Sequence, residues 1–386
     1  MENISQDAIA QLVDGRPTAP AVTIYAPMHR ESSPPNMTED QIRFKNLIRE
    51  VSEILKNRDD GKAVERELCG KLEELLDDKT FWEHQTEGLL VCSRPGALHM
   101  YHLPIDTEEY VAVDTHFHLA PVFSLLQDRQ DYYAFVLAQQ DPAIYSGDAY
   151  GLYPAGVVLP RNLAAALNID EPNQRNVQQR SAGGSALNTF GYNGRGGTKD
   201  YRDNDRTLYF RYLDDILCDK LDSTKPLVIA GVESEIAEFR DISRYPKILS
   251  GAVLGSFGGS GTHDLFAKVF DVIRKEIINP RHTAAIESYE RLRGVHPERI
   301  ADTFAAITDA ADDGRIDTLL IGMLRYTRDT VRNDFEPVAR ISFPGPEPSK
   351  VIHDTAYAVW NQGGSIINTE YEHMPETHPM LASLRY

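Results

Sequence analysis

Residues 173–211 read NQRNVQQRSAGGSALNTFGYNGRGGTKDYRDNDRTLYFR, a polar stretch with almost no apolar periodicity before its last residues. Glycine clusters interrupt it at 183–184 and 194–197. Its seven basic and three acidic residues leave a local formal charge of +4, in a chain whose formal charge is −18. This composition fits either an arm that contacts phosphate groups or a disordered surface loop, and composition alone does not choose between them.

The rest of the chain has the composition of an ordinary globular protein. Its 386 residues are enough for two or three domains, and 41% of them are hydrophobic. No uninterrupted apolar run approaches the roughly 20 residues that a membrane helix needs. The start, MENISQDAIAQLVDG, lacks the basic and apolar regions of a signal peptide. Three scattered cysteines, Cys69, Cys92 and Cys218, favour a reducing compartment, so we expect a cytoplasmic location.

Helical and strand patterns alternate along the chain, which predicts an α/β fold. Strands are expected at 21–26, 88–93, 98–103, 132–138, 227–230, 318–321 and 365–367. Helices are expected from about 38 to 56 and at 62–77, 207–221, 263–278, 284–292 and 351–362. These elements group into domains at 1–114, 115–257 and 262–386, of which the second carries the basic loop 173–206.

Motifs for common chemistry are missing. The run GRGGT at 194–198 has neither the Walker pattern nor the strand-then-GxGxxG context of a dinucleotide site. Its glycines permit close backbone approach, and Arg195 and Lys199 supply charge for phosphate. The acidic pairs at 214–215 and 312–313 are interpreted as solvated charge. We therefore expect no catalytic residues and no cofactor.

A short histidine motif is the one candidate for a metal site. Asp114, His116 and His118 alternate along a predicted strand end, which would bring two imidazoles to one face. No third ligand is evident nearby, and such a pair is more often structural than metal-binding. We therefore expect no metal.

Several stretches together resemble a known family. They are HFHLAPVFSLLQDRQDYYAFVLAQQDPAIYSGD (116–148), GRGGTKDYRDNDRTLYFRYLDDIL (194–217), SFGGSGTHDLFAKVF (256–270), GRIDTLLIG (314–322), NQGGSIINT (361–369) and SLRY (383–386). In this order they resemble the bacterial branch of the archaeo-eukaryotic release factor and Pelota family. The resemblance implies a three-domain α/β architecture with mixed sheets flanked by helices. Its first domain would reach the decoding centre, its middle loop the peptidyl-transferase centre, and its third, similar to kink-turn-binding ribosomal proteins, the large subunit.

The resemblance also implies two sets of rRNA-binding residues. At the peptidyl-transferase centre they would be Gly194, Arg195, Gly196, Gly197, Thr198, Lys199, Arg202 and Arg206. On the decoding-centre side they would be His29, Arg30, Arg43, Lys45 and Arg49. Alternatively, these residues belong to an ordinary solvated helix surface.

Two departures from the family pattern bear on activity. The family's Gly-Gly-Gln is replaced by Gly196-Gly197-Thr198, and threonine has no amide to position the hydrolytic water. The codon-reading Asn-Ile-Lys-Ser motif is also missing from the helix that would begin at 41–44. Both departures predict a factor that neither reads stop codons nor releases peptides.

The sequence thus predicts a ribosome-binding hibernation or rescue factor in the A site. Its expected partners are the 70S ribosome, through 16S rRNA, 23S rRNA and ribosomal proteins, and elongation factor Tu, whereas DNA and membranes are not expected. One alternative is a ribosome-dependent peptidyl-tRNA hydrolase that works despite Thr198. Another is a ribosome-independent interaction protein with a disordered basic loop.

Overall fold

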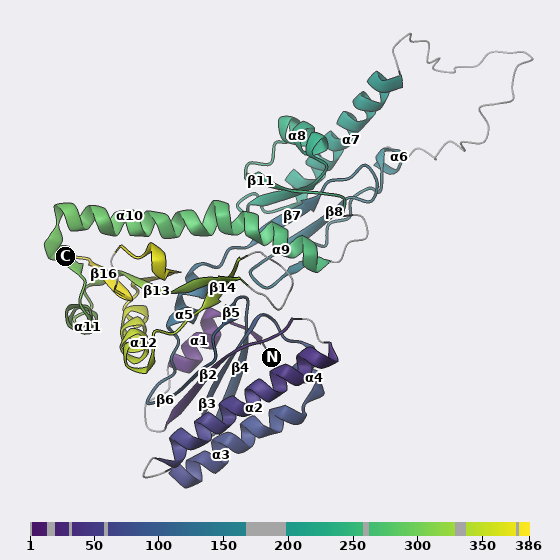
Figure 1. The fold of residues 1–386 in the computed structure, drawn as a ribbon. Coiled ribbons are helices and arrows are strands. Elements are labelled where there is room, and N and C mark those ends of the chain that lie inside the picture. Colours follow the sequence, from purple (N-terminus) through teal and green to yellow (C-terminus); the bar gives the residue numbers. More distant parts are fainter. Residues whose placement is uncertain are drawn as a thin grey trace, which may run out of the picture. The chain divides into compact units, whose positions relative to one another are not determined.

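The computed structural model describes residues 2–13, 20–30, 33–57, 61–166, 198–257, 262–328, 337–375 and 378–386 (Figure 1). The chain forms two compact units. Unit 1 contains Met1–Arg129 and Ile278–Tyr386, and unit 2 contains Gln130–Ile277. Both ends of the sequence therefore build one unit, and the middle of the sequence builds the other.

The N-terminal segment of unit 1 forms a mixed five-stranded sheet in the order β1-β4-β3-β2-β6. Both faces are covered: Val22 and Ile24 of β2 pack with α2 and α3, whereas Ala21 and Tyr25 belong to a second core cluster. Burial on both faces explains why β2 is almost continuously apolar. Figure 1 shows α2 and α3 side by side along this sheet. The elements are β1 (Glu2–Asn3), α1 (Gln6–Val13), β2 (Ala21–Pro27), α2 (Pro34–Lys56), α3 (Gly61–Glu74), η1 (Leu75–Asp77), α4 (Lys79–Glu83), β3 (Gly88–Arg94), β4 (Ala97–Leu103), β5 (Asp106–Thr107), β6 (Tyr110–Asp114) and α5 (Ala120–Gln127).

The C-terminal segment of unit 1 builds a sheet around the long strand β13, in the order β12-β16-β13-β14-β5, with β15 parallel to β13. Leu319 and Ile321 of β13 lie in the core cluster with α5, α11 and α12, whereas Leu320 packs with Tyr289 of α10. The elements are α10 (Asn279–Val295), η3 (Pro297–Arg299), β12 (Ile300–Ala301), α11 (Phe304–Asp312), β13 (Ile316–Arg328), β14 (Pro337–Ile341), α12 (Pro346–Asn361), β15 (Ser365–Glu370), η4 (Tyr371–His373) and β16 (Met380–Leu384).

A seam joins the two segments of unit 1. We use this name for residues 106–120 together with the residues 340–357 that contact them. Strand β5 pairs in parallel with β14, and Arg340 Nε donates to Asp106 Oδ2 at 2.7 Å. The ring of Tyr110 stacks on Phe343 with a centroid distance of 4.0 Å. Backbone pairing, an ion pair and an aromatic stack therefore connect the N-terminal sheet to the C-terminal one.

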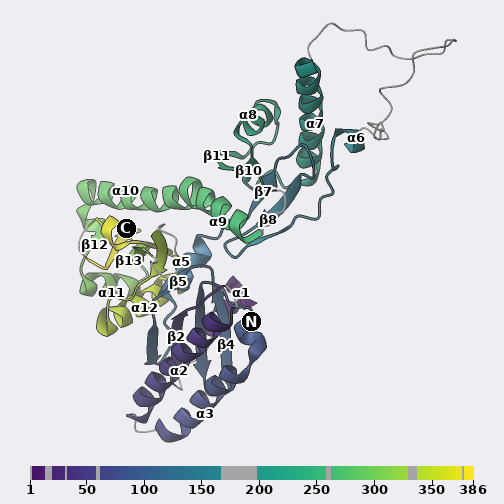
Figure 2. The ribbon, with the colours of Figure 1, turned by 45° about the vertical axis from the view of Figure 1, so that its right-hand side comes forward.

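Unit 2 contains a mixed sheet in the order β11-β10-β7-β8-β9, in which β7, β10 and β11 run parallel. Helices α7 and α8 accompany this sheet in Figure 2. Their Phe210 and Phe239 pack with Phe135 of β7 in one core cluster. Helix α9 contacts β10 and β11. The elements are β7 (Tyr132–Val136), β8 (Ala143–Gly147), β9 (Leu152–Pro154), α6 (Leu163–Ala166), α7 (Thr198–Lys220), β10 (Leu227–Gly231), α8 (Glu233–Ile242), β11 (Ile248–Leu254), α9 (Thr262–Ile273) and the π-helical turn η2 (Arg274–Ile278).

The predicted α/β class, with mixed sheets flanked by helices, is confirmed. The predicted domains at 1–114, 115–257 and 262–386 stay a prediction, and the units divide the chain at other residues. Helix α5 falls within the predicted middle domain 115–257 but lies in unit 1, because it packs on β15 and α12.

Some element boundaries differ from the sequence pattern. Helix α7 starts at Thr198, nine residues before the predicted start at 207. The sequence pattern missed these residues because 198–206 is polar and has no apolar period. Strand β11 is not predicted at all, because its residues ILSGAVL are mostly half-buried and contain a glycine. Across the described ranges, no helix is both long enough and apolar enough to span a bilayer.

Core packing in unit 2 gives the first prediction. Phe239 is fully buried, with ring centroids 5.3 Å from Phe135 and 6.1 Å from Phe210. We expect Phe239→Ala to lower the free energy of unfolding of unit 2 by about 3–5 kcal/mol, because it leaves a cavity among aromatic rings. Hydrogen exchange of β7 and β10 measures the loss.

Leu208→Ala is the matched control, because it removes a side chain on α7 that is 44% exposed. Both tryptophans, Trp82 and Trp360, lie in unit 1, so their fluorescence reports on that unit separately. Equal losses of protection in the two variants would contradict the assignment of Phe239 to the core.

Candidate functional site

Most residues predicted on the basic arm lie outside the described part of the chain. The residues outside it are Gly194, Arg195, Gly196 and Gly197. The next ones, Thr198, Lys199 and Arg202, lie in α7, where the structure describes the backbone and not these side chains. Arg206 is described in full. The rRNA-binding roles of all these residues stay predictions.

Ion pairing holds the first described turns of α7 against α8. Arg206 Nε donates to Glu238 Oε2 at 2.6 Å, and the hydroxyl of Thr207 donates to the other oxygen of the same carboxylate. The Arg206 side chain is 29% exposed. Its guanidinium therefore already has a carboxylate partner, and this ion pair connects α7 to α8.

A second set of polar contacts connects α7 to the end of α8 at Asp214, whose environment was predicted wrongly from the sequence. Asp214 was expected to be solvated, but it is 1% exposed. Its Oδ1 accepts the Ser243 hydroxyl at 2.6 Å, and its Oδ2 accepts Arg244 Nε at 3.0 Å. The burial of Asp214 could have been predicted from its position in the sequence. It is four residues after Phe210 and three before Leu217, and therefore on the core face of the helix.

The contacts of Asp214 and of Arg206 are structural contacts that the sequence reasoning missed. Together they attach α7 to α8 and to the turn that follows α8. Asp215, the neighbour of Asp214, is exposed, as expected for a solvated carboxylate, and pairs with Arg244.

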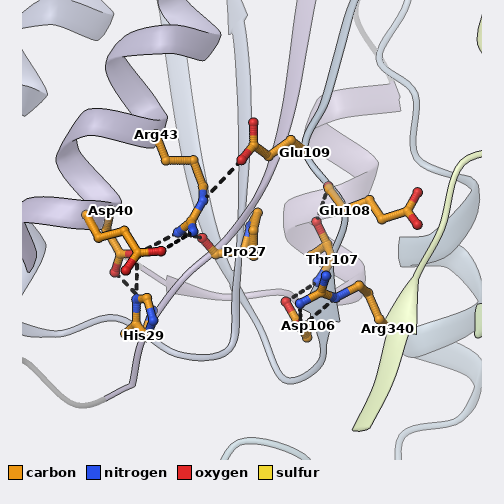
Figure 3. Close-up of polar contacts among 10 residues, drawn as sticks. Pro27, His29, Asp40, Arg43, Asp106, Thr107, Glu108, Glu109 and Arg340 are labelled. Atoms are coloured by element: carbon orange, nitrogen blue, oxygen red, sulfur yellow. Dashed lines mark hydrogen bonds and ion pairs between the residues drawn. The ribbon is translucent and has the colours of Figure 1, made fainter. Parts of the chain in front are cut away.

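A buried carboxylate organises two of the basic residues that were predicted to bind rRNA in the first domain (Figure 3). Asp40 is 2% exposed. Its Oδ1 lies 2.8 Å from His29 Nδ1 and 2.9 Å from Arg43 Nη1, and its Oδ2 accepts the backbone N–H of His29 at 3.0 Å. Arg43 has three further acceptors, namely Pro27 O, Glu39 and Glu109.

The other three predicted basic residues differ in their surroundings. Arg30 forms a two-bond ion pair with Glu87, with Nε–Oε1 at 2.8 Å and Nη2–Oε2 at 2.6 Å. Lys45 and Arg49 are exposed on α2. Thus His29, Arg30 and Arg43 hold the loop after β2 onto α2 and β3, and Lys45 and Arg49 are better placed to meet a phosphate.

The motif considered as a metal site lies in the seam. Asp114 Oδ2 is 3.3 Å from His118 Nε2, and Asp114 also pairs with Lys350 of α12. His116 Nε2 lies 2.6 Å from Asp354 Oδ1. These side chains join the two segments of unit 1. Within the described ranges, no group of three or more histidines, cysteines or acidic residues has the arrangement of a metal site.

The three cysteines are poor nucleophiles. Burial raises the pKa of Cys69 to about 11, and it also raises the pKa of Cys92, which is fully buried. Burial followed by the Asp214 carboxylate raises the pKa of Cys218. All three thiols therefore stay protonated at neutral pH, which leaves thiolate catalysis without a candidate.

Unit 2 combines a mixed sheet with the long helix α7, which follows a basic, glycine-rich stretch of sequence. Its residues 130–275 match the model of bacterial archaeo-eukaryotic release factor family 6. The resemblance predicted from the sequence is thus confirmed for this segment. A search of curated proteins finds no match to the chain.

Solved structures of translation factors match the chain with low similarity. The archaeal translation termination factor aRF1 is 12% identical with a TM-score of 0.25, and the match covers 98% of this chain and 96% of that chain. Archaeoglobus fulgidus Pelota is 13% identical with a TM-score of 0.36, covering 78% and 79%. S. cerevisiae Dom34, a translation termination-like factor, is 8% identical with a TM-score of 0.34, covering 75% and 72%. At these values no residue role is transferred from them.

The Asp40 cluster gives the second prediction. We expect Asp40→Ala to lower the free energy of unfolding of unit 1 by about 1–3 kcal/mol, because it leaves the donors of His29 and Arg43 without a charged acceptor. Urea denaturation followed by tryptophan fluorescence measures this, since Trp82 packs 5.7 Å from Phe44 of α2.

Glu39→Ala is the matched control on the same helix. Glu39 also pairs with Arg43, but its side chain is 55% exposed, so its loss should change stability by less than about 1 kcal/mol. If the two variants lost the same stability, Asp40 would not be the organising carboxylate.

Proposed function

We propose that this chain is a non-catalytic ribosome-binding factor that acts in hibernation or rescue in the cytoplasm. The proposal rests on one observation: the segment that matches a release factor family contains the basic arm with its local charge of +4. Release factors act on the ribosome, and a basic arm gains affinity for rRNA by releasing counterions from phosphate. The net charge of −18 repels phosphate elsewhere, so binding would be confined to local patches.

In this proposal the arm enters the A site of the 70S ribosome and reaches the peptidyl-transferase centre. Arg195 and Lys199 would contact phosphates of 23S rRNA, and the glycines beside them would permit close backbone approach. The ion pairs of Arg206 and Asp214 on α7 support this role, because a helix that is fixed before binding lowers the entropic cost of binding for the residues next to it.

The absence of catalysis follows from Thr198. Its hydroxyl sits on a short side chain and cannot combine an amide donor with a carbonyl acceptor, which the family's glutamine does. The arm would therefore occupy the catalytic centre without hydrolysing peptidyl-tRNA. In unit 1, Lys45 and Arg49 would contact 16S rRNA phosphates without reading a codon. Ribosomal proteins and elongation factor Tu would be the protein partners.

Ribosome co-sedimentation at physiological salt tests this function. We expect the wild-type chain to pellet with 70S particles from starved or cold-shocked cells. The double variant Arg195→Glu/Lys199→Glu should bind at least about tenfold more weakly, and the slope of log affinity against log salt should fall by roughly 2, because two phosphate contacts are lost.

Lys220→Glu is the control, since it reverses an exposed charge at the far end of the same helix. It should bind like the wild type. Failure of the wild-type chain to pellet would reject the proposal and favour a ribosome-independent interaction protein.

The family match also favours a second function, peptidyl-tRNA hydrolysis at the ribosome. A peptide-release assay on stalled complexes separates the two functions. We expect release at background level from the wild-type chain and an increase in Thr198→Gln, which restores the family's glutamine. Wild-type release that disappears in Gly197→Ala would establish the hydrolase and refute the non-catalytic role.

A further inference from the structure

A stack of histidines crosses the seam of unit 1. His118, just after β6, is 3% exposed, and His353 of α12 is fully buried. Their ring centroids are 4.5 Å apart and their planes are inclined by 28°. The ring centroid of His116 is 6.0 Å from that of His118. The stack therefore joins the N-terminal segment to the C-terminal one through imidazole rings, the side chains whose ordinary pKa is nearest to neutral pH.

The hydrogen bonds of His353 suit only its neutral form. Its Nδ1 accepts the backbone N–H of Ala120 at 3.1 Å, so its single proton is on Nε2. That Nε2 is buried and has no hydrogen-bond partner. A second proton would have to displace the Ala120 bond, and it would put a buried charge beside His118 without a compensating partner.

The surrounding charges are already paired with one another. Asp114 binds Lys350 and accepts both the backbone N–H and the hydroxyl of Thr115, and its Oδ2 lies 3.3 Å from His118 Nε2. On α12, Asp354 binds His116 and Lys350. Within the described part of the chain, no ion pair joins His353 to a carboxylate. His118 differs, because a proton on it would face Asp114.

Tyrosines complete the surroundings of the stack. Tyr110 Oη lies 2.7 Å from His118 Nδ1, and Tyr25 of β2 donates to the backbone oxygen of His118 at 2.8 Å. Burial raises the pKa of Tyr110 to about 12 and also raises the pKa of Tyr25, so neither ring becomes an anion that would stabilise a histidine cation. Glu108, another acidic residue of the seam, accepts the backbone N–H of Phe343 at 3.2 Å.

The direction of the pH effect follows from these contacts. Burial, followed by the neighbouring His118 and His116, holds the pKa of His353 well below its ordinary value. Burial also lowers the pKa of His118, although Asp114 opposes this. A histidine whose pKa is depressed by folding stabilises the closed state fully above its ordinary pKa of about 6.5, and this contribution falls as the pH drops. Acid should therefore weaken the seam.

We propose that the His118–His353 stack is an acid-sensitive latch, and that protonation of His353 opens the seam between the two segments of unit 1. Opening would separate Tyr110 from Phe343 and β5 from β14, the contacts that connect the N-terminal sheet to the C-terminal one. The latch belongs to the free protein, so it does not depend on the proposed ribosome binding.

Hydrogen exchange of the full chain at about pH 7.5 and about pH 5.5, corrected for intrinsic exchange rates, tests the latch. At one unit below the ordinary histidine pKa, one imidazole held neutral lowers the closing equilibrium constant by about tenfold. We therefore expect α12 and β14 to lose about tenfold in protection. Strand β10, in unit 2, should keep its protection and serves as the internal control.

His353→Asn removes the titrating group and keeps an acceptor for the Ala120 N–H, so it should abolish the pH effect in α12. His296→Asn, at an exposed histidine that pairs with Glu298, should leave the effect unchanged. Equal corrected protection of the wild-type seam at both pH values, or an undiminished effect in a folded His353→Asn chain, would overturn the proposal.

A measurement on the wild type covers the case in which His353→Asn fails to fold. The NMR signal of the His353 ring should stay at its neutral position while the seam is closed and should titrate together with the loss of protection in α12. Titration of His353 with the seam still protected would also overturn the proposal.

Discussion

The pairing of β5 with β14 is the constraint on which unit 1 depends. It joins residues far apart in the sequence, since Asp106 and the Arg340 that binds it are separated by 234 positions. The aromatic stack of Tyr110 on Phe343 and the histidine stack beside it complete the same junction. Because both ends of the chain are held in one unit, residues 130–277 form a separate unit inserted between them. The release-factor-like segment is this insertion.

The number of basic side chains that can bind a phosphate depends on which of them are already paired with carboxylates, and not only on the total charge. A chain with a formal charge of −18 contains enough carboxylates to occupy many of its basic side chains. Arg30, Arg43 and Arg206 illustrate this, because each is bound to glutamate or aspartate within its own unit. A guanidinium that already has a carboxylate partner gains less from a phosphate than a solvated one does. Basic residues counted in the sequence therefore overstate the surface that is available to RNA.

Much of the fold was predictable because its signals are local. The hairpin of β3 and β4 and the apolar face of α2 each depend on a few neighbouring residues, whose periodicity is readable in the sequence. Strand β11 was not predictable in this way, because it exists through its parallel pairing with β10. The start of α7 was missed for a related reason: its polar first turns carry no apolar period.

By itself, the sequence determined the α/β class, the basic, glycine-rich stretch with its Gly-Gly-Thr, and the resemblance to release factors that the family match bears out for residues 130–275. These properties reside in residue types and short spacings. The tertiary structure alone decided which charges are paired: Arg30 with Glu87, 57 residues away, and Asp214 with Arg244 at a buried position. It also decided that both chain ends share one unit. The physical reason is that ion pairs and strand pairings form between residues that only folding brings together, so no local pattern specifies them.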